Sequence, residues 1–206
     1  MKQNNILPTS AEIRALKKKA MQMTVQAGGG HLGAAFSCAE IVSVLYKNIL
    51  NVRPKQPSFP NRDRFILSKG HGCLAVYVIL ANLGFFPKKA LELYCTTKGI
   101  LPGHTTITIP GVEASTGSLG HGLSIGVGMG IAAKLDRKNW RVFVVLSDGD
   151  CQEGSTWEAV MAAGHHKLDN LTAIVDYNNL CSFEKVSSTF SNFEPLVDKF
   201  SSFGWS

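Results

Sequence analysis

Two short polar segments follow apolar runs in the second half of the chain. Asp148 and Gly149 come just after the apolar run 141–146. Asn178 comes directly after the apolar run 171–177 and lies 30 residues after Asp148. A carboxylate and a side-chain amide offer hard oxygen ligands of the kind that Mg²⁺ accepts, whereas zinc sites mostly use sulfur and nitrogen. The residue types and their spacing therefore predict a partial magnesium site, to be completed by phosphates and water.

The residue after the carboxylate adds a second chemical feature. Gly149 has no Cβ, so a phosphate could approach its backbone closely. A helix expected from about residue 153 would direct free N–H groups toward the same place. Together these features suit Mg²⁺ with a diphosphate. The alternative is that Asp-Gly and Asn-Asn are ordinary turns, and these two segments alone leave both interpretations open.

The elements that must position these residues follow from the alternation of apolar runs with helical patterns. This alternation predicts an α/β fold, with a parallel sheet flanked by helices on both faces. Strands are expected at 64–68, 141–146 and 171–177, and helices at 10–27, 37–50, 73–84, 88–98, 122–136 and 153–166. The carboxyl ends of neighbouring parallel strands share one sheet edge, where ligands bind. That topology would bring Asp148 close to Asn178.

Local signals refine several of these elements. Ser10 is expected to cap the first helix, and Ser37, with Glu40 three residues later, to open the second. The helix 122–136 contains four glycines, at 122, 126, 128 and 130, and each costs about 1 kcal/mol against alanine. Close approach of another backbone, from a neighbouring helix or a partner subunit, would explain them. The three-proline segment 51–63 is expected to be a surface connection, and the long loop 101–122 to be functional.

Composition excludes several classes of protein. The 206 residues suit one domain, and a net charge of +6 suits anionic ligands. Lys17-Lys18-Lys19 is the only tight basic run and lies in a helical pattern, so no nucleic-acid partner is expected. The five cysteines form no C-x-x-C pair, which argues against a zinc site and suits a reducing cytoplasm. No apolar run is long enough for a signal peptide or a bilayer span, so we expect a soluble cytoplasmic protein without a membrane partner.

Several further segments resemble, in order along the chain, the amino-terminal diphosphate-binding part of transketolase. They are GGGHLGAAFSCAEIVSVLY, DRFILSKGHG, LPGHT, GVEASTGSLGHGLSIGVGMG and FGW. The Asp148-Gly149 pair with its distant Asn is similar to the thiamine diphosphate motif of that family. The resemblance runs from about residue 10 to the end, and is particularly to the split transketolases, whose halves are separate polypeptides.

The resemblance implies two cofactors, thiamine diphosphate and Mg²⁺. Its implied metal ligands are Asp148, Asn178 and the backbone carbonyl of Leu180. Its implied contacts with thiamine diphosphate are His71, Gly117, Leu119, Asp148, Gly149, Glu153 and Asn178. In the family, Gly149 would donate its N–H to the diphosphate, and Glu153 would join the cofactor sites of the two halves through a hydrogen-bond network.

The resemblance also implies an activity, the transfer of a two-carbon ketol unit from a ketose donor to an aldose acceptor. The implied catalytic residues are His31, His71 and His104. Imidazole suits such a site because protons leave and return to sugar hydroxyls, and it titrates near neutrality. The pairs His71-Gly72 and Gly103-His104 favour transketolase over 2-oxoacid dehydrogenases and deoxyxylulose-phosphate synthase, which share the Asp/Asn clamp.

The sequence departs from the family's pattern at three positions. Ser147 replaces the first glycine of Gly-Asp-Gly, Leu32 replaces the proline that usually follows His31, and His121 replaces a common glutamine. A small serine should fit, with at most a slight shift in the geometry of the turn. These changes indicate a divergent branch of the family that acts on an unusual sugar.

The resemblance also implies that the pyrimidine-binding domain, which supplies the glutamate that activates the cofactor, belongs to another chain. We therefore expect residues 1–206 to form one diphosphate-binding domain that lacks its C-terminal part. The implied partner is a C-terminal, pyrimidine-binding transketolase subunit, in a hetero-oligomer built on a dimer that acts on sugars or sugar phosphates. The glycine-rich helix is a candidate surface for this partner.

Two alternatives remain open on the sequence. A truncated or non-catalytic subunit would bind the partner but no cofactor, and cofactor binding separates it from the enzyme. A Mg²⁺-dependent phosphatase of the haloacid dehalogenase type could use Asp148 and Asp150 as nucleophile and acid. Against that alternative, such a motif normally begins its domain, whereas about 140 residues precede it here.

Overall fold

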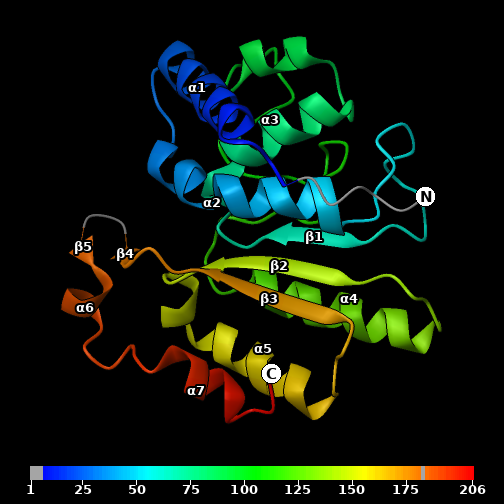
Figure 1. The fold of residues 1–206 in the computed structure, drawn as a ribbon, viewed down its shortest axis with the longest axis vertical. Helices are drawn as coiled ribbons and strands as arrows, with labels where there is room; N and C mark the ends of the chain where they lie inside the picture. The colour runs from blue at the N-terminus through cyan, green and yellow to red at the C-terminus, as the bar shows by residue number, and fades with distance from the viewer. Residues whose placement is uncertain (1–6, 182–183) are drawn as a thin grey trace. The chain divides into compact units, whose positions relative to one another are not determined.

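The expected parallel sheet is present, with its three strands side by side (Figure 1). The computed structural model describes residues 7–181 and 184–206. The sheet contains β1 (Arg64–Leu67), β2 (Val142–Ser147) and β3 (Leu171–Asp176), paired in parallel in that order. All six residues of β2 are buried, as its continuous apolar pattern predicts. The register places Ser147 opposite Asp176, so the two strands end side by side.

The chain divides into two units, each described by itself. Residues 1–63 and 70–117 form one, here called the helical unit, and residues 64–69 and 118–206 form the other, the sheet unit. The elements of the helical unit are α1 (Ser10–Ala27), α2 (Leu32–Val44), the π-helical turn η1 (Leu45–Ile49) and η2 (Gly70–Gly72), followed by α3 (Cys73–Leu83) and η3 (Lys88–Leu93). Helix α3 is apolar on all sides because it packs against both α1 and α2.

The sheet unit surrounds its three strands with short elements. Besides the strands, these are α4 (Gly122–Leu135), η4 (Asp150–Gln152), α5 (Gly154–His165), β4 (Leu180–Cys181), β5 (Glu184–Lys185), α6 (Val186–Thr189) and α7 (Leu196–Ser201). Helix α4 packs against the strands and against α5. The chain's last described residues also pack on α5, where Trp205 Nε1 donates to the Val160 carbonyl at 2.9 Å.

The first helix has the expected bounds but a different cap. Ser10 is its first helical residue, and Thr9 is the N-cap, so the expected role of Ser10 is wrong. The N–H of Glu12 donates to Thr9 Oγ1 at 3.2 Å, and the N–H of Thr9 donates to the Glu12 carboxylate at 2.6 Å. This reciprocal pair is a capping box, which the sequence offers one residue before the predicted cap.

The second helix begins five residues before its predicted start. It opens at Leu32, and Ser37 lies inside it, where its Oγ donates to the Ala34 carbonyl at 3.1 Å. An interior serine can make this backbone hydrogen bond without ending a helix, so the Ser-x-x-Glu pattern was misleading here. The helix expected at 88–98 is also shorter, since only the 3-10 turn Lys88–Leu93 forms.

Two of the four glycines of α4, Gly122 and Gly126, face the strands or a strand end of this same chain. A Cβ at Gly122 would lie 2.6 Å from Ser68 Cα, and a Cβ at Gly126 would lie 2.6 Å from a methyl group of Val144. The expected backbone approach is therefore found at Gly122, but with a strand end rather than with a helix. Among the described residues no atom lies within 4 Å of such a Cβ at Gly128, so α4 is open at this position.

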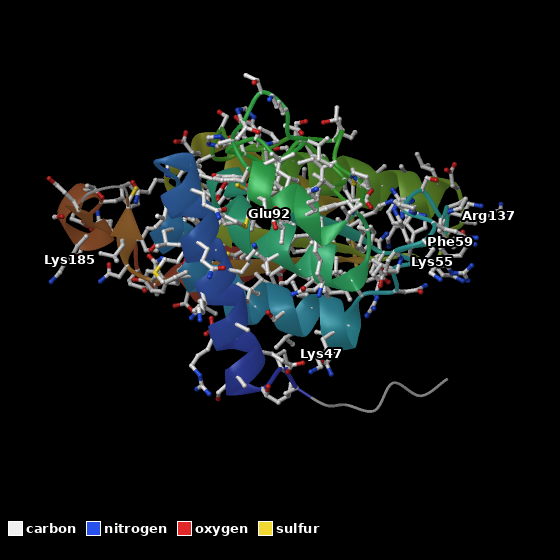
Figure 2. All side chains as sticks on the ribbon, turned by 90° about the horizontal axis from the view of Figure 1, so that it is seen from above. Lys47, Lys55, Phe59, Glu92, Arg137 and Lys185 are labelled. Carbon is white, nitrogen blue, oxygen red and sulfur yellow. The ribbon has the colours of Figure 1, made fainter. Side chains whose placement is uncertain are left out.

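The proline-containing segment lies at the surface, as expected. Lys55 and Phe59 mark this segment in Figure 2, and the Arg53 guanidinium stacks over the Phe59 ring at 3.6 Å from its centroid. No helix within residues 7–181 and 184–206 combines the length and the apolar character needed to cross a membrane.

Candidate functional site

The predicted metal ligand at the end of β2 is buried and incompletely satisfied. Asp148 is only 1% exposed, and its Oδ1 accepts the N–H of Gly149 at 3.0 Å. Its Oδ2 is buried and has no hydrogen-bond partner in the part of the chain that the structure describes. Burying a carboxylate oxygen without a donor is costly. A bound cation is a group that would satisfy this oxygen, so Asp148 fits a metal ligand.

The surroundings of Asp148 also show that the two strand ends meet. Burial raises the pKa of its carboxyl, and the N–H groups of Gly149, Asn179 and Leu180 and the charge of Lys69 lower it in part. Asn179 and Leu180 follow β3, so the segments after β2 and β3 share this carboxylate, as the topology predicts. Neither of these two N–H groups makes a complete hydrogen bond to Oδ2.

The second predicted ligand belongs to an exposed turn. The side-chain oxygen of Asn178 accepts the N–H of Leu180 at 2.9 Å, and both residues are exposed. Asn179 between them has a positive φ of 60°, a conformation that asparagine tolerates. An amide oxygen has two lone pairs, so Asn178 could hold this turn and still coordinate a metal. Among the described residues there is no group of three or more His, Cys, Asp or Glu suited to a metal. The predicted set needs none, because it contains a single carboxylate.

A second aspartate in the same turn has a different environment. Asp150 is fully buried, and its Oδ1 accepts the Ser68 hydroxyl at 2.6 Å and the N–H of Gly120 at 2.9 Å. Its Oδ2 accepts both the N–H and the hydroxyl of Ser147 at 2.8 Å. Both oxygens are thus occupied by donors from the protein. The phosphatase alternative needs Asp150 as a free acid beside Asp148, and this arrangement does not favour it.

Three residues with predicted cofactor contacts gather around this turn. A Cβ at Gly149 would lie 3.1 Å from Leu119 Cδ1, so the two residues touch. Gly120, with a φ of 84°, lies so close to α5 that a Cβ there would be 2.6 Å from Glu153 Cβ. Glu153 is the N-cap of α5 and is exposed.

A buried ion pair next to this edge was not predicted from the sequence. Lys69 Nζ lies 2.7 Å from Asp176 Oδ2, and the two side chains are 2% and 7% exposed. Lys69 follows β1 and Asp176 ends β3, so the pair joins the two strands that flank β2. The sequence does place a charged residue at or just after the end of each of these two apolar runs. It contains no signal that the two charges pair across the sheet.

The three predicted histidines lie together in the helical unit. The His31 ring is 5.3 Å from the His71 ring and 5.7 Å from the His104 ring, centroid to centroid, in edge-to-face arrangements. Burial lowers the pKa of His104, and the nearby His31 lowers it further. Gly117, predicted to contact the cofactor, has a φ of 146°, and a Cβ there would be 2.5 Å from His104 Cδ2. The structure therefore brings all three histidines together, with Gly117 against one of them.

Two buried side chains of α3 hold the turn that carries His104. The Tyr77 hydroxyl donates to the carbonyls of Pro102 and His104, at 3.0 and 2.7 Å. The Cys73 thiol donates to the Gly103 carbonyl at 3.1 Å. Burial raises the pKa of Cys73 to about 12, so the thiol stays protonated and can donate. Sequence reasoning assigned these residues only to an apolar helix.

Comparison with known proteins gives consistent similarities. Residues 9–206 match the family described as "Transketolase, thiamine diphosphate binding domain". The chain is 41% identical over 189 residues to one subunit of the apulose-4-phosphate transketolase of Phocaeicola vulgatus, covering 92% of this chain and 67% of that protein. It is 36% identical over 195 residues to the 6-deoxy-6-sulfo-D-fructose transketolase subunit SqwG of a Clostridium species, covering 94% of this chain and 70% of that protein.

Solved structures show the same relationship. The chain superimposes on transketolase from Campylobacter jejuni with a TM-score of 0.88 and 34% identity, covering 93% of this chain and 31% of that one. The chain therefore spans about two thirds of the length of the subunit relatives and about a third of this larger chain. These similarities agree with the order of the motifs in the sequence.

Proposed function

Because this chain belongs to the thiamine diphosphate-binding domain family of transketolase, we propose that it is the diphosphate-binding subunit of a transketolase-like transferase. The proposed reaction moves a two-carbon ketol unit from a ketose donor to an aldose acceptor, with thiamine diphosphate and Mg²⁺ as cofactors. The relatives named for apulose 4-phosphate and for a sulfonated fructose support an uncommon sugar or sugar phosphate as substrate.

The observation that carries this proposal is the unsatisfied oxygen of Asp148. Its Oδ2 is buried, lacks a hydrogen bond from the described residues, and lies where the segments after β2 and β3 meet. Mg²⁺ would take this oxygen, the Asn178 side-chain oxygen and the Leu180 carbonyl as ligands, with phosphate oxygens and water completing its shell. A divalent cation would also keep the carboxyl of Asp148 ionised against the effect of its burial.

The chain's own residues would bind and orient the cofactor. Gly149 lies against Leu119 and Ser147 in the turn after β2, and Glu153 lies next to Gly120. Thiamine diphosphate, when bound, supplies the electron sink that lets a carbon–carbon bond beside a carbonyl break. In this proposal His31, His71 and His104 hold and move protons at the hydroxyl groups of the sugar, a role that suits imidazole near neutral pH.

A second, pyrimidine-binding chain is part of the proposal. Two relatives are named as transketolase subunits, which supports a division of the enzyme between two chains. We propose that this pyrimidine-binding chain is the partner, and that activity needs a hetero-oligomer built on a dimer. The exposed carboxylate of Glu153 and the open side of α4 at Gly128 are the candidate contacts.

A thermal-unfolding titration with thiamine diphosphate and Mg²⁺, run beside Asp148→Ala, tests this function. A ligand at about 100 times its Kd stabilises a protein by about 2.7 kcal/mol, which gives a measurable rise in Tm. The expected result is a rise that needs both ligands and disappears in the variant. Asp169→Ala, which changes an exposed aspartate of the same unit, is the matched control.

The same titration separates the proposal from its main alternative. If no rise occurs at millimolar ligand, either alone or with a pyrimidine-binding partner present, the chain is a non-catalytic, partner-binding subunit. A rise with Mg²⁺ alone that persists in Asp148→Ala would place the metal elsewhere and contradict the assigned site.

A further inference from the structure

The predicted cofactor contacts of the sheet unit share one buried neighbour that is not among them. Asp150 receives hydrogen bonds from the segment after β1 through Ser68, from the loop before α4 through Gly120, and from the end of β2 through Ser147. Its own carbonyl accepts the Thr156 hydroxyl of α5 at 2.6 Å. One residue therefore ties together four segments of the chain.

Three of these segments, those of Ser147, Gly120 and α5, lie next to a residue with a proposed cofactor role. Asp148 and Gly149 stand between Ser147 and Asp150 in the chain. Gly120 is adjacent to Leu119 in the chain, and its backbone packs against Glu153. The Ser68 hydroxyl, the Gly120 N–H, and the N–H and hydroxyl of Ser147 all donate to the Asp150 carboxylate, an acceptor-only group when ionised. A neutral amide or an alkyl group could not satisfy them all.

Ser147 forms the closest partnership with Asp150. Its N–H and its hydroxyl both donate to Asp150 Oδ2 at 2.8 Å, and its Oγ accepts the N–H of Asp150 at 3.0 Å. These three hydrogen bonds link the residue before Asp148-Gly149 to the residue after it, and so hold the two ends of the turn together. The serine stands where the family resemblance expects a glycine, and its side chain has a specific partner here rather than merely fitting the space.

We propose that Asp150 is the positioning residue of the cofactor site and that Ser147 is its dedicated partner. Together they fix the turn so that Asp148 Oδ2 is held without a donor and is left for the metal. Neither residue touches the cofactor in this scheme. This inference rests on the proposed function, since it specifies how that same site is built.

The test is a double-mutant cycle on the 206-residue chain, read by calorimetric titration of thiamine diphosphate in excess Mg²⁺. Asp150→Asn keeps the shape but sets an NH₂ group against donors, so we expect affinity to fall at least tenfold. Ser147→Gly should weaken affinity about threefold to tenfold in the wild-type background, and should have no further effect beside Asp150→Ala. If the Asp150 variants do not fold, Ser147→Ala, which removes only the Oγ contacts, tests the proposal by itself and should still weaken the affinity for thiamine diphosphate.

A structural control separates positioning from general destabilisation. Trp205→Phe removes the hydrogen bond to the Val160 carbonyl in the same unit, away from the turn. It should lower the urea midpoint without changing the affinity for thiamine diphosphate. If Asp150→Asn or Ser147→Ala behaves like this control, or if the two changes are simply additive, the positioning role is overturned. Absence of Mg²⁺-dependent binding in the wild-type chain, both alone and with a pyrimidine-binding chain present, would overturn the proposed function itself, and the inference with it.

Discussion

The two predicted chemical centres, the carboxylate turn of the sheet unit and the histidine cluster of the helical unit, are stabilised in opposite ways. The turn is organised by an acceptor, Asp150, which collects N–H and O–H donors. The His104 turn is organised by donors, Tyr77 and Cys73, which collect backbone carbonyls. A buried charge therefore organises the first centre, and neutral groups organise the second.

This difference has a consequence for the reactive groups themselves. Asp148 is buried with an unsatisfied oxygen and a raised pKa, a state that costs stability until a cation binds. His31 and His104 are in mutual contact and keep part of their surface in solvent, although His104 is also partly buried, which suits groups that exchange protons. The carboxylate turn is thus built to hold a fixed charge, and the histidine cluster to change protonation.

The largest expected effect concerns Asp148. Asp148→Asn keeps the side-chain shape and removes the charge, so Mg²⁺-dependent binding of thiamine diphosphate should fall at least 100-fold, which is about 2.7 kcal/mol. Without ligand, the variant should be as stable as the wild type or more stable, because it no longer buries a charge. Calorimetric titration and urea unfolding measure the two quantities. Lower stability of the unliganded variant would mean that Asp148 is structural.

In the helical unit, Tyr77→Phe tests the neutral scaffold. It leaves the carbonyls of Pro102 and His104 without their buried donor, so the free energy of unfolding should fall by about 1–3 kcal/mol. Binding of thiamine diphosphate and Mg²⁺ per folded chain should change less than in Asp148→Asn. Tyr177→Phe, which removes a hydroxyl bonded to Glu194 at an exposed position, is the control and should change the urea midpoint far less. Equal midpoints for both variants would show that the Tyr77 hydroxyl does not hold this turn.

The reactive residues were easier to propose from the sequence than the residues that hold them in place, which are Asp150, Tyr77 and Cys73. The strands and the reactive residues have local signals, such as an apolar run followed by Asp-Gly, and the α/β fold and the family resemblance are confirmed. The supports depend on partners far apart in the chain, since Ser68 is 82 residues from Asp150 and Pro102 is 25 residues from Tyr77. No local periodicity encodes such pairs. The capping pattern at Ser37 failed for a related reason, because the same residue types also occur inside helices.

A smaller effect is expected at Asn178, the exposed member of the predicted metal site. Asn178→Ala removes one neutral ligand oxygen and the hydrogen bond to Leu180, so affinity for Mg²⁺ in the presence of thiamine diphosphate should fall about tenfold. The urea midpoint should hardly change, because the turn is exposed. Asn179→Gly is the matched control, since glycine accepts the positive φ of that position. If Asn178→Ala lowered the affinity as much as Asp148→Asn does, the amide would contribute as much to Mg²⁺ binding as the carboxylate, and the expected order of effects would be wrong.

The pH dependence of stability tests whether the pKa of Asp148 is raised in the folded chain. Its pKa in the folded chain is raised above the ordinary 3.8, so its charged form destabilises the fold at neutral pH. That cost should disappear as the pH falls through the raised pKa toward 3.8. The Tm of Asp148→Asn should therefore equal or exceed that of the wild type at pH 7, and any excess should shrink on acidification. A gap that widens toward low pH would mean that the folded pKa is lowered instead.

The smallest effect tests whether the histidines influence one another. Burial lowers the pKa of His104 first, and the positive charge of His31 lowers it further. His31→Gln removes that charge, and the pKa of His104 should rise, since a charged imidazole then meets less repulsion. The imidazole C–H signals followed by NMR across neutral pH measure this value, with His121→Gln as the control in the sheet unit. A pKa that stays constant in His31→Gln would leave burial as the only cause, and the histidines would then titrate independently rather than as a coupled group.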